Sequence, residues 1–98
     1  MSRIVYVDGA FVPEEEARVS VFDRGFLFAD GVYEVTSVLG GRLIDFPGHV
    51  RRLGRSLAEL ALANPHSEAE WLALHRDLVA RNAVTDGLVY LEVTRGSA

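Results

Sequence analysis

The chain opens with two short runs of β-branched and aromatic residues, a composition that favours β-strands. Residues 4–7 (IVYV) and 10–12 (AFV) lie on either side of residues 8–9 (DG), a dipeptide typical of two-residue hairpin turns. Pro13 ends the second run, because proline has no N–H group to donate to a β-ladder. The pattern therefore predicts a β-hairpin, followed at 14–16 (EEE) by a solvated acidic loop.

The longest strand pattern covers residues 32–39 (VYEVTSVL), which alternate with a period close to two. We expect Tyr33 and Val35 on one face of this strand, and Glu34 and Thr36 on the other. The strand therefore presents an aromatic side chain and a carboxylate in opposite directions.

Turn signals lie on both sides of this long strand. Residues 23–25 (DRG) and 30–31 (DG) predict two turns around a short apolar triplet, and residues 19–22 are expected to be extended. The Gly-Gly pair at 40–41 predicts a hairpin turn that returns in a strand over 42–45. Three chain reversals are thus expected within a short stretch.

The apolar spacing becomes helical after this hairpin. Asp45 and Phe46 stand ahead of Pro47, and an aspartate before a first-turn proline is typical of a helix start. The pattern predicts a helix that ends at about Ala63. Its apolar stripe is expected to comprise Val50, Leu53, Leu57, Leu60 and Ala61.

A second helix is predicted from Ser67, because Ser67 and Glu70 have the spacing of a capping box. A turn at 86–87 (DG) then leads into a last strand over 88–94. This order indicates an α+β fold in one domain over 1–98, with a small, mostly antiparallel sheet and two helices packed on one face. The buried face of the second helix is expected to include Trp71, Leu74 and Leu78, with Leu72 and Val79 beside them.

Composition narrows the chemistry that this fold can support. The chain has 98 residues, a net charge of -4 and no apolar run near the roughly 20 residues of a membrane span, so we expect a cytoplasmic domain with no nucleic-acid or membrane partner. It contains no cysteine, and all ten basic residues are arginines. Without lysine, no side chain of these residues can form a Schiff base.

Arg51, Arg52 and Arg55 lie in the first turns of the first predicted helix. A helix N-terminus and a guanidinium group both favour an anion such as phosphate, although a solvated helix face is the plain alternative. Arg52 precedes Leu53 of the apolar stripe and can therefore border a cleft.

Other polar and aromatic side chains leave more than one interpretation open. Tyr33 is either part of the core or presents its hydroxyl at the mouth of a cleft, and Glu34 could pair with an arginine of the same domain. His49, His66 and His75 have no metal-ligand spacing, and we expect them on the surface.

Three segments together resemble the class IV pyridoxal-phosphate aminotransferases. They are residues 23–34 (DRGFLFADGVYE), 40–53 (GGRLIDFPGHVRRL) and 90–96 (YLEVTRG). The similarity extends over essentially the whole chain and is greatest to the N-terminal domain of the D-amino-acid type. The resemblance implies an enzyme that uses pyridoxal phosphate to move an amino group between an amino acid, of D or branched-chain type, and a 2-oxo acid. It also implies a two-domain subunit, usually in a homodimer.

The resemblance also implies roles for three residues. Arg52 would hold the cofactor phosphate, Tyr33 would face the substrate, and Val35 would lie near the cofactor on the same strand face as Tyr33. In this family the Schiff-base lysine comes from a C-terminal domain, which is absent from these 98 residues. We therefore assign no catalytic residue and no metal ligand here, and expect this chain alone to be inactive.

Three other functions stay open at this point. The first is an aminodeoxychorismate lyase, which shares the fold of the aminotransferases. The second is a stand-alone, non-catalytic module that binds an anion or a partner through Tyr33 and Arg52. The third is a structural domain in which the arginines only solvate a helix.

Overall fold

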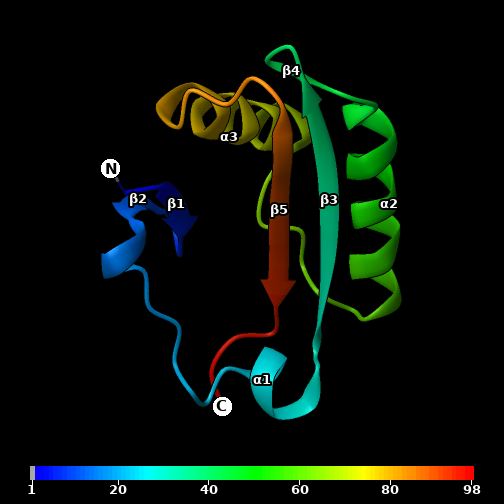
Figure 1. The fold of residues 1–98 in the computed structure, drawn as a ribbon. Helices are drawn as coiled ribbons and strands as arrows, with labels where there is room; N and C mark the ends of the chain where they lie inside the picture. The colour runs from blue at the N-terminus through cyan, green and yellow to red at the C-terminus, as the bar shows by residue number, and fades with distance from the viewer. Residues whose placement is uncertain (1) are drawn as a thin grey trace.

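The computed structural model describes residues 2–98, which form an α+β fold, as the sequence predicts. Along the chain, a hairpin and a short helix come first, then two strands, two long helices and a last strand (Figure 1). In order they are β1 (Ile4–Val7), β2 (Ala10–Pro13), the 3₁₀ turn η1 (Glu14–Glu16), α1 (Arg24–Phe28), β3 (Gly31–Leu39), β4 (Arg42–Leu43), α2 (Phe46–Glu59), α3 (Glu68–Arg81) and β5 (Gly87–Thr94).

All the strand pairs are antiparallel, and they form two separate sheets. β1 and β2 make the predicted hairpin, in which Asp8 and Gly9 both adopt positive φ, the conformation that a tight two-residue turn requires. The larger sheet has the order β4-β3-β5, and β3 pairs with β5 along almost its whole length, from Gly31 opposite Thr94 to Val38 opposite Gly87. β3 is therefore the central strand of this sheet.

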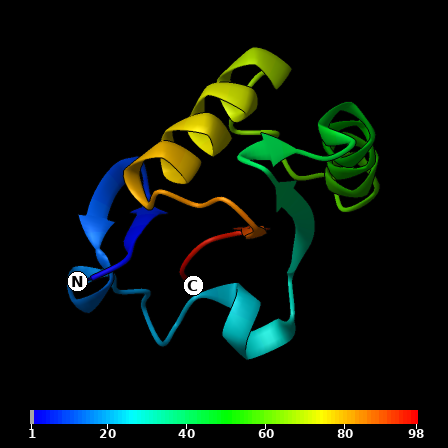
Figure 2. The ribbon, with the colours of Figure 1, turned by 45° about the horizontal axis from the view of Figure 1, so that its top comes forward.

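The core lies between the larger sheet and two helices, α2 and α3, which occupy one side of the strands (Figure 2). Glu34, Thr36 and Val38 of β3 point into this layer, and the alternation expected for the strand is confirmed. Val89 of β5 does the same. The buried cluster comprises Phe46, Val50, Leu53, Leu57 and Trp71.

The first long helix starts where the sequence predicts but ends earlier. Asp45 is the N-cap and Pro47 lies in the first turn, whereas the last helical residue is Glu59 rather than Ala63. Ala61 has a φ of 54°, which ends the helical path and leaves Ala61 and Leu60 exposed instead of in the apolar stripe.

Three predictions around the hairpins are wrong in detail. The turn expected at 23–25 is the start of helix α1, because the Asp23 carboxylate accepts a hydrogen bond from the Gly25 N–H at 2.8 Å and caps the helix. Residues 19–22 were expected to be extended, but Val21 and Phe22 lie in a turn. The return strand after Gly41 covers only 42–43, since the chain turns towards α2 directly afterwards.

The predicted capping box of α3 is confirmed, with Ser67 and Glu70 bonded to each other's main chain. Trp71 is buried as expected, whereas Leu74 and Leu78 are both only half-buried. His75 contradicts the expectation of surface histidines, because it occupies the core side of this helix one turn after Trp71.

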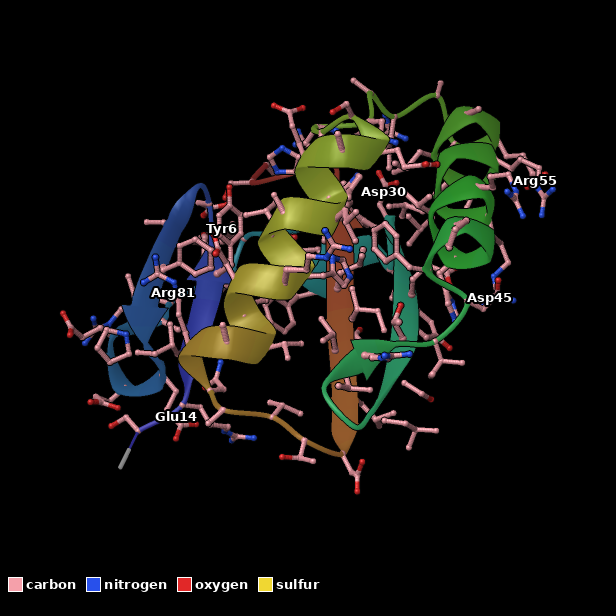
Figure 3. All side chains as sticks on the ribbon, turned by 90° about the horizontal axis from the view of Figure 1, so that it is seen from above. Tyr6, Glu14, Asp30, Asp45, Arg55 and Arg81 are labelled. Atoms are coloured by element: carbon pink, nitrogen blue, oxygen red, sulfur yellow. The ribbon has the colours of Figure 1, made fainter. Side chains whose placement is uncertain are left out.

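The β1–β2 hairpin is attached to α3 rather than to the larger sheet. The side-chain amide of Asn82 accepts from the Ile4 N–H at 2.8 Å and donates to the Ile4 carbonyl at 2.9 Å. Arg81, the last residue of α3, lies with its guanidinium 4.1 Å from the centre of the Phe11 ring, on the side of α3 that faces the hairpin (Figure 3). No helix of residues 2–98 is both long and apolar enough to cross a membrane.

Candidate functional site

Glu34 is the centre of a polar cluster between β3 and α2. Its side chain is only 4% exposed, yet it lies among groups that stabilise its charge. Arg52 donates through Nε to Oε2 at 2.7 Å and through Nη2 to Oε1 at 2.8 Å, while His49 Nδ1 lies 2.8 Å from Oε1. The predicted pairing of Glu34 with an arginine of the same domain is thus confirmed, in the bidentate form that carboxylates favour.

Helix α2 brings both partners to the carboxylate. His49 and Arg52 are three residues apart, a spacing that places two side chains on the same side of a helix. Packing of Val50 and Leu53 into the core fixes the rotation of α2 over β3. The His49–Arg52 edge of the helix is consequently held next to Glu34.

The charges of this cluster reinforce each other. The hydrogen bond from Arg52 lowers the pKa of Glu34 below its ordinary value, against the opposing effect of burial, and His49 adds to the decrease. In turn, the hydrogen bond to Glu34 raises the pKa of Arg52. Glu34 is therefore an anion at neutral pH, and it holds the guanidinium of Arg52 in one orientation.

Arg52 keeps donors for a further anion. A guanidinium group has five N–H bonds, and those that Arg52 directs at Glu34 belong to Nε and Nη2. The side chain is 60% exposed, so the remaining N–H groups, including both on Nη1, are open to a ligand. The donor set fits a phosphate group, which guanidinium groups bind through parallel hydrogen bonds.

Tyr33 and Val35 occupy the other face of β3, which no helix covers in residues 2–98. Tyr33 is 64% exposed, so the alternative that it belongs to the core is wrong. Its ring stacks on Tyr90 of β5, with ring centres 5.7 Å apart and planes at 17°. Val35 is half-buried on the same face. Tyr33 thus offers an aromatic surface at an open sheet face.

The start of β3, next to Tyr33, is held in place by close main-chain packing. A Cβ atom on Gly31 would come within 2.8 Å of the Val93 carbonyl oxygen, so glycine permits the pairing of β3 with β5 at this point. Arg95 binds Asp30 through an ion pair of 2.6 Å and also donates to the Leu60 carbonyl at 2.7 Å. These contacts join the beginning of β3 to the end of α2.

The structure separates the three residues that the sequence singled out. Arg52 approaches Glu34 from the helix side, whereas Tyr33 and Val35 lie on the opposite face of the same strand. Arg55 points outward from α2, away from the sheet (Figure 3). His49 was not anticipated as part of the cluster, although its spacing of three residues from Arg52 is a signal that could have identified it.

We expect the cluster to make stability dependent on pH on the acid side. Because the folded-state pKa of Glu34 lies below the value of 4.5 of the free side chain, its contribution is present above about pH 4.5 and is lost as the pH falls through the folded-state value. Urea denaturation of the protein and of Glu34→Gln should differ most above about pH 4.5, and the difference should shrink as the pH falls below that value.

A matched variant tests whether this convergence is specific to Glu34. Glu16 is exposed and forms no ion pair within residues 2–98, so Glu16→Gln should leave the pH dependence of unfolding unchanged. A difference between the protein and Glu34→Gln that stays constant from about pH 3 to about pH 6.5 would contradict the assignment.

Comparison with known sequences connects this chain to a protein family. The family described as "Amino-transferase class IV" matches residues 31–98, which include β3, α2, α3 and β5. A D-alanine aminotransferase of Listeria monocytogenes serotype 4b is 44% identical over 92 residues, covering 94% of this chain and 32% of the relative. A D-alanine aminotransferase of Staphylococcus aureus MSSA476 is 39% identical over 94 residues, covering 96% of this chain and 33% of the relative. The chain thus spans about a third of the length of these curated relatives.

Solved structures agree with the arrangement of the elements. A branched-chain amino acid aminotransferase from T.th., complexed with N-(5'-phosphopyridoxyl)-L-glutamate, superimposes with a TM-score of 0.90 at 23% identity, covering 99% of this chain and 34% of that one. The branched-chain aminotransferase of Thermoproteus uzoniensis with norvaline superimposes with a TM-score of 0.78 at 27% identity. The match covers 94% of this chain and 32% of that one. The first of these similarities concerns the fold alone.

Proposed function

This chain belongs to the class IV aminotransferases, and on that premise we propose that it forms the N-terminal domain of a pyridoxal-phosphate-dependent enzyme. In this proposal the domain provides one wall of the pocket for cofactor and substrate. The complete protein transfers an amino group between an amino acid and a 2-oxo acid. The observation that carries the proposal is the geometry of Arg52, which is fixed by Glu34 and still exposes N–H groups.

Arg52 is proposed to bind the phosphate of the cofactor. Glu34 holds its guanidinium and is itself held by His49, so that little side-chain freedom is lost when the phosphate binds. The negative charge of Glu34 is already offset by Arg52, and the phosphate is then bound by the exposed donors. In support, two structural neighbours are described as complexes with a phosphopyridoxyl ligand and with pyridoxamine 5'-phosphate.

Tyr33 and Val35 are proposed to line the substrate side of the pocket. Pyridoxal phosphate, when bound, supplies the electron-withdrawing ring on which amino transfer depends. Tyr33 contributes an aromatic surface that excludes water and a hydroxyl that can hydrogen-bond to a substrate, and Val35 adds apolar contact area. The domain binds and orients, and it contains no lysine for the covalent step.

A D-amino acid is the substrate class that the comparisons favour. The relatives with the higher identities, 44% and 39%, are named D-alanine aminotransferases. The branched-chain enzymes match at lower identity, 23% and 19% in two cases, and similarities at that level support only a shared fold. We therefore propose a D-amino acid such as D-alanine as the amino donor and a 2-oxo acid as the acceptor.

The remaining part of such a protein is proposed to form a second domain that covers the open surface of this one. Tyr33, Leu39, Leu88 and Tyr90 are exposed on the larger sheet. An open groove of about 1560 Å³ runs between β1, α3 and β5, and nothing in residues 2–98 pairs with the outer edge of β5. Long, apolar edge strands of this kind are normally covered in native proteins. A homodimer would bury further surface.

We expect residues 1–98, prepared alone, to self-associate. The exposed apolar side chains of the open sheet face favour contact between copies. Size-exclusion chromatography with light scattering should give a mass above that of one chain. Leu88→Ser, on the open face, should reduce association, whereas Leu60→Ser, at the end of α2, should not. A monomer at high concentration would contradict the expectation.

Amino transfer by the intact protein tests the proposed function directly. The protein is loaded with pyridoxal phosphate and mixed with D-alanine and 2-oxoglutarate, and pyruvate formation is measured. L-leucine as the donor is the comparison for the branched-chain type, followed through its own 2-oxo acid product. We expect pyruvate from D-alanine and little transfer from L-leucine. If the loaded protein transfers no amino group from either donor, the proposal is wrong and a non-catalytic binding module is the better explanation.

A further inference from the structure

The ring of His75 contains one buried nitrogen with no partner. His75 is only 3% exposed, and its Nδ1 lies 2.7 Å from the main-chain oxygen of Trp71, one helical turn earlier. A carbonyl oxygen can only accept, so Nδ1 carries the proton and donates it. Nε2 of the neutral ring is then an acceptor, and it has no hydrogen-bond partner within residues 2–98.

Such a group is unusual, because buried polar atoms are nearly always hydrogen-bonded and an unsatisfied one is strongly unfavourable. Burial lowers the pKa of His75, so protonation of Nε2 does not remove the problem at neutral pH. The charged or titratable groups that face His75 across the core are Glu34 of β3 and His49 of α2. A neutral partner that can donate a hydrogen bond would satisfy Nε2.

A small cavity lies beside His75, between α2, α3 and the larger sheet. It offers about 10 Å³ to the centre of a water molecule, which is room for one. Apolar side chains form most of its wall, among them Phe46, Val50 and Leu53. The polar side chains that line it are Glu34, Thr36, His49 and His75.

The hydrogen-bonding capacity of these groups matches one water molecule. His75 Nε2 can only accept, and Thr36 is 1% exposed with a hydroxyl that can donate. A carboxylate has about four acceptor positions, and the contacts of Glu34 with Arg52 and His49 use three. A water molecule that donates to His75 and Glu34 and accepts from Thr36 would make about three hydrogen bonds, the usual number for buried water.

We propose that this cavity binds one structural water molecule that connects His75 of α3 to Glu34 of β3. The water satisfies the buried ring nitrogen and supports the Glu34 carboxylate through the acceptor position that Arg52 and His49 leave free. His75 is then a positioning residue, because it acts on Arg52 only through the water and Glu34. This last step rests on the proposed role of Arg52 in phosphate binding, whereas the water site itself does not.

A crystal structure of the intact protein, at a resolution that reveals ordered water, tests the site. We expect one water within about 2.7–3.2 Å of His75 Nε2 and within the same range of Thr36 Oγ1. Thr36→Val keeps the shape of the side chain and removes the hydroxyl, so the water should be lost or weakly occupied. Thr36→Ser keeps the hydroxyl and should retain it. A dry cavity in the unmodified protein would overturn the proposal.

Ligand binding tests the connection to Arg52. The dissociation constants of pyridoxal phosphate and of pyridoxal, which lacks the phosphate, are compared in the unmodified protein, Thr36→Val, Thr36→Ser and His75→Phe. For pyridoxal phosphate we expect an increase of about threefold to tenfold in Thr36→Val and His75→Phe, and none in Thr36→Ser. Binding of pyridoxal should not change, whereas general loosening of the core would weaken both ligands.

The two proposals fail in different ways. If the unmodified protein binds pyridoxal and pyridoxal phosphate equally well, the proposed role of Arg52 is wrong, and the crystal structures alone decide the water site. If phosphate binding is normal and Thr36→Val leaves it unchanged although the water is gone, His75 does not position Arg52. Should His75→Phe fail to fold, the two Thr36 variants still give the answer.

Discussion

Replacement of Leu53 by alanine is expected to lower the free energy of unfolding by about 2–5 kcal/mol, the range for a leucine removed from a closed core. Leu53 is 0% exposed and belongs to the buried cluster that joins α2 to the sheet. Domains of this size have a total stability of roughly 5–15 kcal/mol. The substitution should therefore remove a large part of it, as measured by the urea midpoint.

Leu60→Ala is the matched control for this experiment. Leu60 follows the last turn of the same helix, and its side chain is exposed. Its removal should cost less than about 1 kcal/mol, since surface substitutions outside special features have small effects. Equal losses in the two variants would show that the core does not centre on Leu53.

Replacement of Arg52 by alanine is expected to weaken binding of pyridoxal phosphate by roughly tenfold to a hundredfold, the range for losing hydrogen bonds to a charged group. The exposed N–H groups of Arg52 would no longer reach the phosphate, and Glu34 would keep its charge without the guanidinium beside it. Binding to the intact protein can be followed by the absorbance of the cofactor.

Arg55→Ala provides the comparison, because Arg55 lies on the same helix and points away from the sheet. Its loss removes one positive charge without touching the Glu34 cluster, so affinity should change less than about threefold. Arg52→Lys should be intermediate, since an ammonium group keeps the charge but cannot reproduce the planar, bidentate contact. Equal affinity in Arg52→Ala and the unmodified protein would exclude Arg52 from the phosphate site.

Most of the helices and strands could be predicted from the sequence, because their positions depend on interactions between residues that are close together in the chain. The alternation of β3, the Asp8-Gly9 hairpin and the Ser67 capping box each follow from neighbouring residues alone. Helix α1 was missed because Asp23 caps a helix of only five residues, too short to show a period. The end of α2 was misplaced because Ala61 adopts a positive φ that alanine does not signal.

The candidate site was harder to predict than the fold, because it is formed by contacts between elements that are far apart in the sequence. A carboxylate on the strand face opposite Tyr33 suggested a pair with an arginine of the same domain, but only the packing of α2 on β3 brings Glu34 to Arg52 and His49. The burial of His75 could not be predicted from its helical position, since it takes a place in the core beside Trp71 and Phe46. Family resemblance supplied the roles of Arg52, Tyr33 and Val35, which stay predictions.

The pairing of β3 with β5 also constrains how the domain can be made. β3 leaves the ribosome before α2 and α3, yet its long partner strand, ending at Thr94, comes after both helices. During synthesis the helices can form early, whereas the strand carrying Tyr33 and Glu34 waits with one edge unprotected. Contacts between such distant segments slow folding, and an exposed strand promotes aggregation. We expect this interval to be the point at which a nascent chain most needs a chaperone.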